Sequence, residues 1–197
     1  MGAINFNNTQ VTLKNIFVKN IDSEDSINIF NSTFDLENCY FSHVLSDAID
    51  FDFSNGSAKN IKFNLIGNDA IDFSGSNAIV ENIVFNRVGD KVVSVGENSR
   101  VKIFDIEGKN SLIGVASKDG SDTYLENAKF TDVEYPFTAY KKKEAYQFGN
   151  LNLNNYTVIG FKKKYVRDIK STIFDKELNK KMGSVDEESN LIIKNII

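Results

Sequence analysis

The sequence is poor in the residues that usually mark disulfide-rich, metal-binding or linker proteins. Its 197 residues include one cysteine, one proline, one histidine and no tryptophan. A single cysteine, Cys39, excludes an internal disulfide framework. One proline and 12 glycines are too few for a flexible linker or a low-complexity chain. No apolar run approaches the roughly 20 residues that span a bilayer, so no membrane span is expected.

The net charge of the chain limits the kinds of molecule that it is expected to bind. The formal net charge is -4, which argues against a general nucleic-acid binder, because such proteins are normally basic. Hydrophobic residues make up 41% of the chain and charged residues 25%, so it can bury a core. The start, "MGAINFNNTQ", has no basic segment followed by an apolar one, so no signal peptide is visible.

A short repeat carries most of the information. "SDAIDFDF" at 46–53 is followed by "NDAIDFSG" at 68–75. Written in steps of 22 residues, the chain gives a column of apolar residues, namely Ile27, Ile49, Ile71, Val93, Val115 and Phe137. The residue after each of them is mostly polar, and the next is mostly apolar. This alternation predicts a short strand with one buried face in every repeat.

A second column contains asparagine or aspartate, and each member is followed by an apolar or small residue. Its members are Asn15, Asn38, Asn60, Asn82, Asp105 and Asn127. An asparagine side chain both donates and accepts, so like residues on stacked strands can form a hydrogen-bonded ladder, which we expect to be buried. A unit of about 22 residues built from short strands and polar turns predicts one turn, or rung, of a parallel β-helix. The expected fold class is therefore all-β, a single-stranded solenoid.

The end of the chain departs from the repeat. We expect the parallel β-helix over residues 1–161 and an irregular C-terminal cap over 162–197, in which a short helix could lie. The last segment, "NLIIKNII" at 190–197, predicts a final apolar strand. Because an open rung exposes strand edges, a cap or a neighbouring domain is expected there.

Five ordered segments resemble a known family. They are "SDAIDFDFSNG", "GNDAIDFSGS", "GDKVVSVGENS", "IGVASKDGS" and "FTAYKKKE". Across roughly residues 25–145 the chain resembles the right-handed parallel β-helix repeat family of the pectate-lyase-like superfamily. The related type occurs in bacterial surface proteins beside spore-coat-kinase-like domains. This resemblance implies a right-handed coil, a location outside the cell or at its surface, and carbohydrate chemistry as the superfamily's common theme.

The repeat also predicts a stripe of carboxylates on one outer face. If Ile49 and Phe51 point inward, Asp50 and Asp52 point outward, and Asp72 stacks one rung after Asp50. The simplest interpretation is a solvated acidic face. A hard cation such as calcium, held by Asp50, Asp52 and Asp72, is a second one. Catalytic carboxylates are a third.

Further along the same face lie candidate ligand-binding residues. Together with Asp50, Asp52 and Asp72 they are Ser94, Lys118 and Tyr140. Catalysis on an acidic sugar would need a cation or lysine to neutralise the substrate and a base to remove a proton. Asp50, Asp72, Lys118 and Tyr140 are the catalytic candidates, and Lys91 and Lys141 are further neutralisers. The single histidine, His43, is expected in a turn, and Cys39 in the core.

Three functions are compatible with these features. The first is a non-enzymatic β-helix module of a bacterial surface or secreted protein, presenting a polar face to a glycan or protein partner. The second is a polysaccharide lyase or epimerase acting on acidic glycans. The third is a structural rod of a larger assembly, in which a neighbouring domain is the partner. No cofactor other than calcium is suggested. Short turns between strands favour binding over catalysis, because large loops usually wall β-helix active sites.

Overall fold

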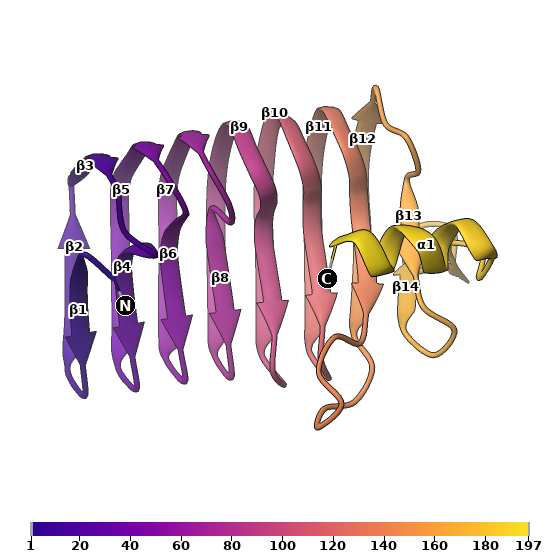
Figure 1. The fold of residues 1–197 in the computed structure, drawn as a ribbon, viewed down its shortest axis with the longest axis horizontal. Coiled ribbons are helices and arrows are strands. Elements are labelled where there is room, and N and C mark those ends of the chain that lie inside the picture. Colours follow the sequence, from indigo (N-terminus) through magenta and orange to yellow (C-terminus); the bar gives the residue numbers. More distant parts are fainter. Residues whose placement is uncertain (1, 197) are drawn as a thin grey trace.

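The computed structural model describes residues 2–196 as a single coil of stacked strands with one helix against its side (Figure 1). It is a parallel β-helix of about 8 turns, each about 22 residues long, as the repeat predicts. The strands are β1 Ile4–Asn7, β2 Gln10–Lys14, β3 Phe17–Ile21, β4 Asp25–Phe30, β5 Thr33–Val44, β6 Asp47–Asp52, β7 Asn55–Ile66, β8 Ile71–Ser74, β9 Asn77–Gly96, β10 Arg100–Lys118, β11 Asp122–Tyr140, β12 Asn150–Ile159, β13 Tyr165–Arg167, β14 Thr172–Asp175 and β15 Lys180–Lys181.

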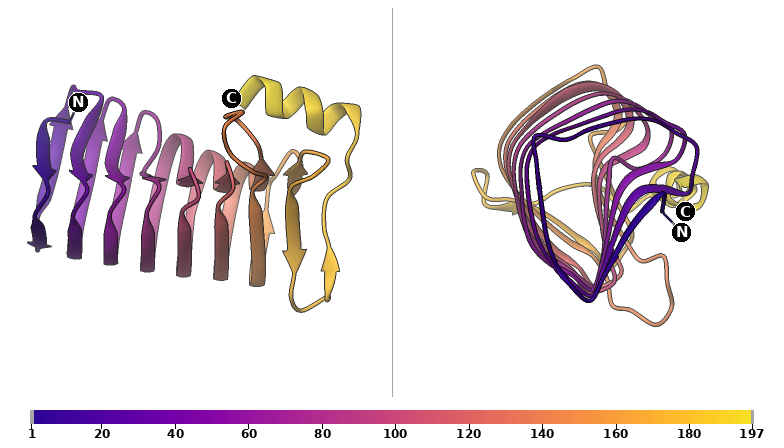
Figure 2. Two further views of the ribbon diagram at one scale, coloured as in Figure 1. Left: turned by 90° about the horizontal axis from the view of Figure 1, so that it is seen from below. Right: turned by 90° about the vertical axis from the view of Figure 1, so that its left-hand side faces the viewer.

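Each rung pairs in parallel with the rungs before and after it. Ile49 lies opposite Ile71 and Asp50 opposite Asp72, in the register that the two quoted repeats predict. Viewed along the axis, successive turns lie one behind another with similar outlines (Figure 2). Among the strand pairs of residues 2–196, the one antiparallel pairing joins β14 to β15 in the cap.

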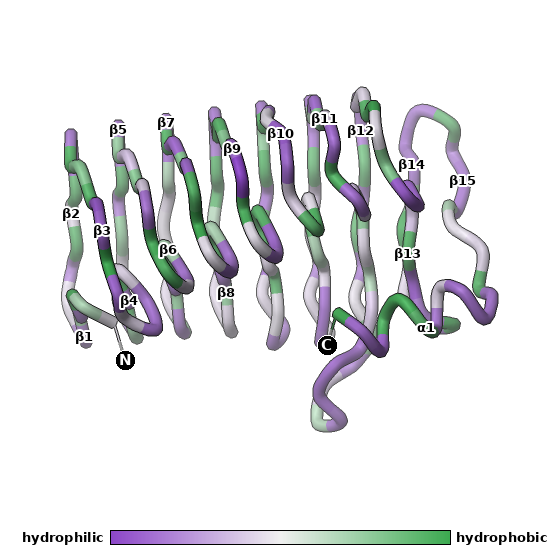
Figure 3. Tube along the Cα trace, turned by 45° about the horizontal axis from the view of Figure 1, so that its top comes forward, coloured by the Kyte–Doolittle hydropathy of each residue, from purple (hydrophilic) through white to green (hydrophobic). Residues whose placement is uncertain are grey.

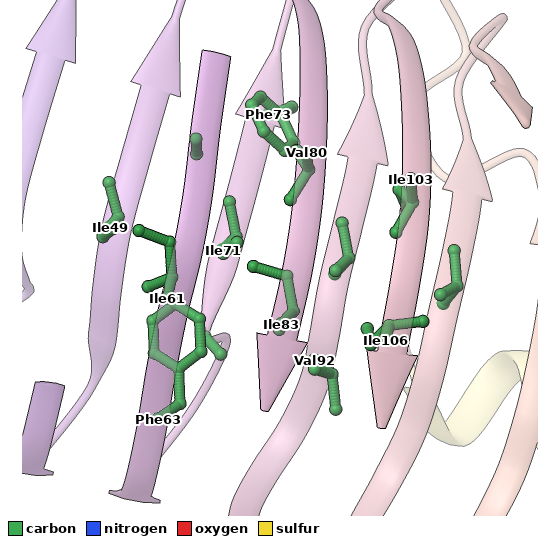
Figure 4. Packing of buried hydrophobic residues seen from close by; sticks show 14 of the residues in the cluster. Ile49, Ile61, Phe63, Ile71, Phe73, Val80, Ile83, Val92, Ile103 and Ile106 are labelled. Atoms are coloured by element: carbon green, nitrogen blue, oxygen red, sulfur yellow. The ribbon is translucent and has the colours of Figure 1, made fainter. Parts of the chain in front are cut away.

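Inward side chains form continuous columns inside the coil. Ile61, Ile83 and Ile106 stand at the same level of successive rungs (Figure 4). Phe51 stacks on Phe73 with ring centroids 5.0 Å apart. Polar and apolar residues alternate along the strands as they do in the sequence (Figure 3). Because each inward side chain is buried by its equivalents in adjacent rungs, one core runs continuously along the coil.

The predicted asparagine ladder is present, but it lies on the outside of a bend. Asn60 donates its side-chain amide to Asn38, and Asn82 donates to Asn60, at 2.9 and 2.6 Å. Each of the six predicted ladder residues has a positive φ, from 54° at Asn82 to 61° at Asn127. This is the left-handed conformation, which asparagine tolerates well. The expectation that ladder residues are buried is wrong, because Asn38 and Asn82 are exposed. The ladder thus fixes a bend in every rung.

The ladder extends further than predicted and has one gap. Asn155 adds a member, because it donates to Asn127 at 2.6 Å. Asn127 donates to Asp105, whereas Asp105 makes no side-chain bond to Asn82 within the described residues. The gap follows from the residue type, because an aspartate carboxylate accepts hydrogen bonds whereas an asparagine amide can also donate them.

A second bend also uses the left-handed conformation. Asn20, His43, Leu65 and Arg87 occupy it, with φ between 54° and 60°. His43, which was expected in a turn, lies at this bend within β5. Cys39 is placed as predicted, in the buried core.

A third turn is tied together by serines that the repeat pattern did not identify. The backbone N–H of Ser54 donates to Ser76 Oγ at 2.9 Å, and that of Ser76 donates to Ser99 Oγ at 2.9 Å. Ser54 Oγ in turn donates to the carbonyl of Asp52. Each hydroxyl therefore satisfies a backbone group of the neighbouring rung in a buried turn, where an unpaired group would be costly.

Parallel stacking continues past residue 161, because β13 pairs with β11 and β14 with β12. The predicted final strand is wrong: residues Glu187–Ile196 form the helix α1, and Ile197 lies outside the described residues. Asp186 caps this helix by accepting the backbone N–H of Ser189 at 2.7 Å, as is usual for an aspartate at a helix start. The apolar residues Ile192, Ile193 and Ile196 share one buried face, the spacing of a helix rather than a strand.

Candidate functional site

The predicted candidate residues lie on one outer side of the coil, which we call the carboxylate face. It is formed by side chains of β4, β6, β8, the final segments of β9 and β10, and the turn before β8, namely Asp25, Asn28, Asp47, Asp50, Asp52, Asp69, Asp72, Lys91, Ser94 and Lys118. Their inward neighbours, such as Ile49, Phe51 and Phe73, are fully buried in the core. Alternation along the strands therefore directs Asn28, Asp50, Asp72 and Ser94 outward, whereas Asp25, Asp47, Asp69 and Lys91 lie at the starts of these segments.

Asp50 is at the centre of this face. Asn28, one rung earlier, donates its side-chain amide to both Asp50 Oδ2 and Asp52 Oδ2, each at 3.0 Å. Burial, with the adjacent carboxylates of Asp52 and Asp72, raises the pKa of Asp50 to about 8. The upward shift reflects the cost of placing a further negative charge among these stacked carboxylates.

A second column runs beside the first and ends in a buried lysine. Asp25, Asp47, Asp69 and Lys91 occupy successive rungs, and Lys91 Nζ lies 3.5 Å from Asp69 Oδ1 and also contacts Asp90. Burial raises the pKa of Asp69, although Lys91 opposes this effect. Burial lowers the pKa of Lys91, but Asp69, Tyr140 and Asp90 outweigh it and hold that pKa above its usual value. Lys91 therefore remains a cation and is already paired.

These aspartates also organise the backbone. Asp47 Oδ1 accepts the backbone N–H of Asp69 at 2.8 Å, and Asp69 Oδ1 accepts that of Lys91 at 3.0 Å. Part of the acidic column is therefore structural, since it orders the start of each strand. Asp90, which the repeat pattern did not identify, belongs to this arrangement through Lys91.

Three neighbouring positions keep hydrogen-bonding capacity unused. Asp50 Oδ1, Asp72 Oδ1 and Ser94 Oγ are buried and have no hydrogen-bond partner in the described part of the protein. They stack on three successive rungs, since Asp50 pairs with Asp72 and Asp72 with Ser94. Lys118 Nζ approaches Asp72 Oδ1 only to 3.8 Å, which is beyond hydrogen-bond distance. A buried oxygen without a hydrogen-bond partner costs about 1–3 kcal/mol, so hydrogen bonds from a bound ligand would stabilise this stack.

The helix α1 covers the continuation of the same columns. Lys91 is followed in register by Ile113, and Ser94 by Ala116, and both of these pack with Ile192, Ile193 and Ile196 of α1. Tyr140 belongs to this cluster and is 0% exposed. Its hydroxyl has no partner among the described residues, and burial raises its pKa. Tyr140 is thus separated from solvent, while Asp50, Asp52 and Asp72 remain partly exposed.

One long loop lies at the edge of these columns. The segment 141–149 lengthens its rung, so that 28 residues separate Asn127 from Asn155. Asp119 Oδ1 accepts the backbone N–H groups of Lys142 and Lys143, each at 2.7 Å. Lys141 forms an ion pair with Glu144, and Lys143 with Glu97. The other turns are short, as expected from the sequence, but this loop was not anticipated.

Over residues 2–196, no group of three or more His, Cys, Asp or Glu side chains is arranged to hold a metal ion. Within the same residues, no helix is both long and apolar enough to cross a bilayer.

No protein-family model matches the chain, and neither a curated protein nor a solved structure is significantly similar to it.

Proposed function

We propose that this chain is a non-enzymatic β-helix module that binds a glycan on its carboxylate face. One observation carries the proposal: Asp50 Oδ1, Asp72 Oδ1 and Ser94 Oγ form a stack of buried oxygens without hydrogen-bond partners in the described chain. A ligand that donates hydrogen bonds would satisfy them and would gain binding free energy from doing so. A purely structural rod is the simplest alternative, but it does not explain why these buried oxygens lack hydrogen-bond partners.

The charge of the face selects the kind of glycan. Aspartates outnumber lysines on it, so an acidic glycan would be repelled. Sugar hydroxyls are neutral donors, and the ammonium group of an amino sugar is a charged one that acidic side chains prefer. The ligand we propose is accordingly a neutral or amino-sugar glycan. A location at the surface of a bacterial cell, as the resemblance to the pectate-lyase-like superfamily implies, belongs to the same proposal.

A polysaccharide lyase or epimerase acting on acidic glycans is the second candidate. Its support is the cluster of perturbed carboxyl groups, which is typical of active sites. Two features weigh against it. Lys91 is held by Asp69 and Asp90, and Tyr140 lies beneath α1, so neither is an accessible base. We therefore favour binding.

The test is a glycan array, scored with added calcium and with a chelator. We expect retention of neutral or amino-sugar glycans, and its loss in the double variant Asp50→Asn and Asp72→Asn. The matched control is Asp35→Asn, because Asp35 is an exposed aspartate on β5, outside the carboxylate face. Binding that is equal in the two variants, or no binding at all, would contradict the proposal.

Two further measurements separate the alternatives. Formation of unsaturated products from uronate polymers would establish the lyase instead. A melting temperature that rises on adding calcium, and does so only while Asp50 and Asp72 are intact, would establish the cation site. If the face is merely repulsive, the double variant keeps or raises the melting temperature in chelator.

A further inference from the structure

A depression of about 710 Å³ lies on a different outer face of the coil. It is lined by residues of β7, β9, β10, β11 and β12 together with Lys176, which follows β14. None of the carboxylate-face residues lines it. We propose that it is a second binding site, and that it takes an acidic oligosaccharide.

The floor of the depression is an apolar and aromatic surface. Ile79, Lys102 and Tyr124 stand in register on consecutive rungs and point outward, because Val80, Ile103 and Leu125 beside them are in the core. Ile79 is 46% exposed, a high value for a large apolar residue in a sheet. Phe104 packs edge-on against Tyr124, with ring centroids 5.9 Å apart. Such a surface suits the apolar face of a pyranose ring.

Cations surround this floor. Arg100, Lys102 and Lys176 all line the depression, and none of them forms an ion pair with any residue in the part of the chain that the structure describes. Lys176 Nζ lies 4.5 Å from the centre of the Tyr124 ring, which places a positive charge directly over the aromatic surface.

The anions of the lining are fewer and already engaged. Asp122 is the one acidic residue of the lining, and its Oδ1 accepts the side-chain amide of Asn152 at 3.2 Å. The depression is therefore positively charged within a protein whose net charge is -4. Charge complementarity thus selects an anionic ligand here, whereas the carboxylate face selects a neutral or cationic one.

The shape indicates an extended ligand. The lining runs from Gly56 through Val101 to Asn152, that is, across successive rungs along the axis. With rungs about 4.8 Å apart, it spans on the order of 20 Å, which suits an oligosaccharide better than a single sugar. A nucleic acid is disfavoured, because it requires a larger basic surface than Arg100, Lys102 and Lys176 provide.

The test is calorimetric titration of the intact protein at low salt with an oligouronate, a sulfated oligosaccharide, a neutral oligosaccharide and a single-stranded oligonucleotide. We expect binding of at least one acidic oligosaccharide, weakened by added salt. The double variant Lys102→Glu and Lys176→Glu should weaken it by about tenfold or more. Tyr124→Ala should weaken it as well, since it removes the aromatic part of the floor and the ring that lies beneath Lys176.

Lys62→Glu is the matched control, because Lys62 is exposed on a part of β7 that does not line the depression. The proposal is overturned if no acidic oligosaccharide binds, if the oligonucleotide binds more tightly, or if Lys62→Glu weakens binding as much as the double variant. Asp50→Asn with Asp72→Asn should leave this binding unchanged, so the two proposed sites can fail separately.

Discussion

Lys118 reaches across one complete rung to face Asp72. Its Nζ lies 3.8 Å from Asp72 Oδ1, and the two side chains are 12% and 22% exposed. Gly96 occupies the rung between them, and a Cβ there would lie 2.9 Å from Lys118 Cε. The missing side chain at Gly96 therefore makes room for the extended lysine, and the position of the cation on the carboxylate face depends on it.

This dependence can be measured with a double-mutant cycle. Lys118→Met and Asp72→Asn should show a coupling energy of about 0.5–1 kcal/mol, the upper range for a partly exposed pair. In a Gly96→Ala background the lysine must move aside, and the coupling should approach zero. Urea unfolding of the single and double variants gives the values. An unchanged coupling in the Gly96→Ala background would show that Gly96 has no such role.

The carboxylate face should make stability depend on pH. The pKa of Asp50 is raised to about 8 and that of Asp25 to about 6, mainly by burial. The folded state then holds protons that the unfolded chain releases near pH 4, so stability should fall as pH rises from about 4 through about 8. Asp50→Asn should flatten the upper part of this decline. Urea unfolding at pH 5, 6.5, 8 and 9 tests it, and equal slopes in the two proteins would refute the assignment to Asp50.

The gap in the asparagine ladder predicts a stabilising substitution. Asp105→Asn provides the missing donor toward Asn82 at a φ of 56°, which asparagine tolerates. It should raise the free energy of unfolding by about 0.5–1.5 kcal/mol, the usual net value of a hydrogen bond. Chemical denaturation measures this change. A loss of stability would show that a hydrogen bond between residues 105 and 82 does not stabilise the coil.

Substitutions at Asn60 can separate the two contributions of a ladder residue, its side-chain hydrogen bonds and its left-handed backbone conformation. Asn60→Ala should cost more than about 1 kcal/mol, because it removes two ladder bonds and places alanine in the left-handed region. Asn60→Gly removes the same bonds but keeps the conformation accessible. Chemical denaturation of both variants gives the comparison. If alanine proves no worse than glycine, the backbone conformation contributes nothing to the cost.

The packing of α1 predicts local rather than global unfolding. Ile193 is buried against the cluster that contains Ile113 and Tyr140. Ile193→Asp would bury a charge and should detach the helix, at a cost of about 2–4 kcal/mol to its docking. Hydrogen exchange should accelerate in α1 while the amides of β7 and β9 stay protected. Equal acceleration throughout would mean that the helix and the coil unfold as one unit.

The coil could be predicted from the sequence because its signal is repeated. Ile49 and Ile71, or Asn60 and Asn82, each report the same local environment, so one rung confirms the next. The end of the chain offers no such repetition. The apolar run around Ile192 and Ile193 fits a strand or a helix equally well by composition, and only the capping aspartate at 186 and the acidic first turn favour the helix.

The candidate site was predictable in part. Alternation placed Asp50 and Asp72 on the outside and in register, but it could not show how far they are buried. Tyr140 was expected among the ligand-binding residues because it follows Lys118 in the same column. Its environment is decided by α1, which lies more than 40 residues later in the chain and follows no repeat. The depression beside Tyr124 arises from side chains that differ between rungs, which a repeat cannot predict.

The loop at 141–149 has a consequence for how such a chain tolerates changes in length. Its additional residues leave Asp122 opposite Asn150 and Leu125 opposite Leu153, so the strands on either side keep their register. A single residue inserted within a strand would instead move every following side chain of that strand to the opposite face. Insertions and deletions should accordingly be found between strands, or as whole multiples of one turn.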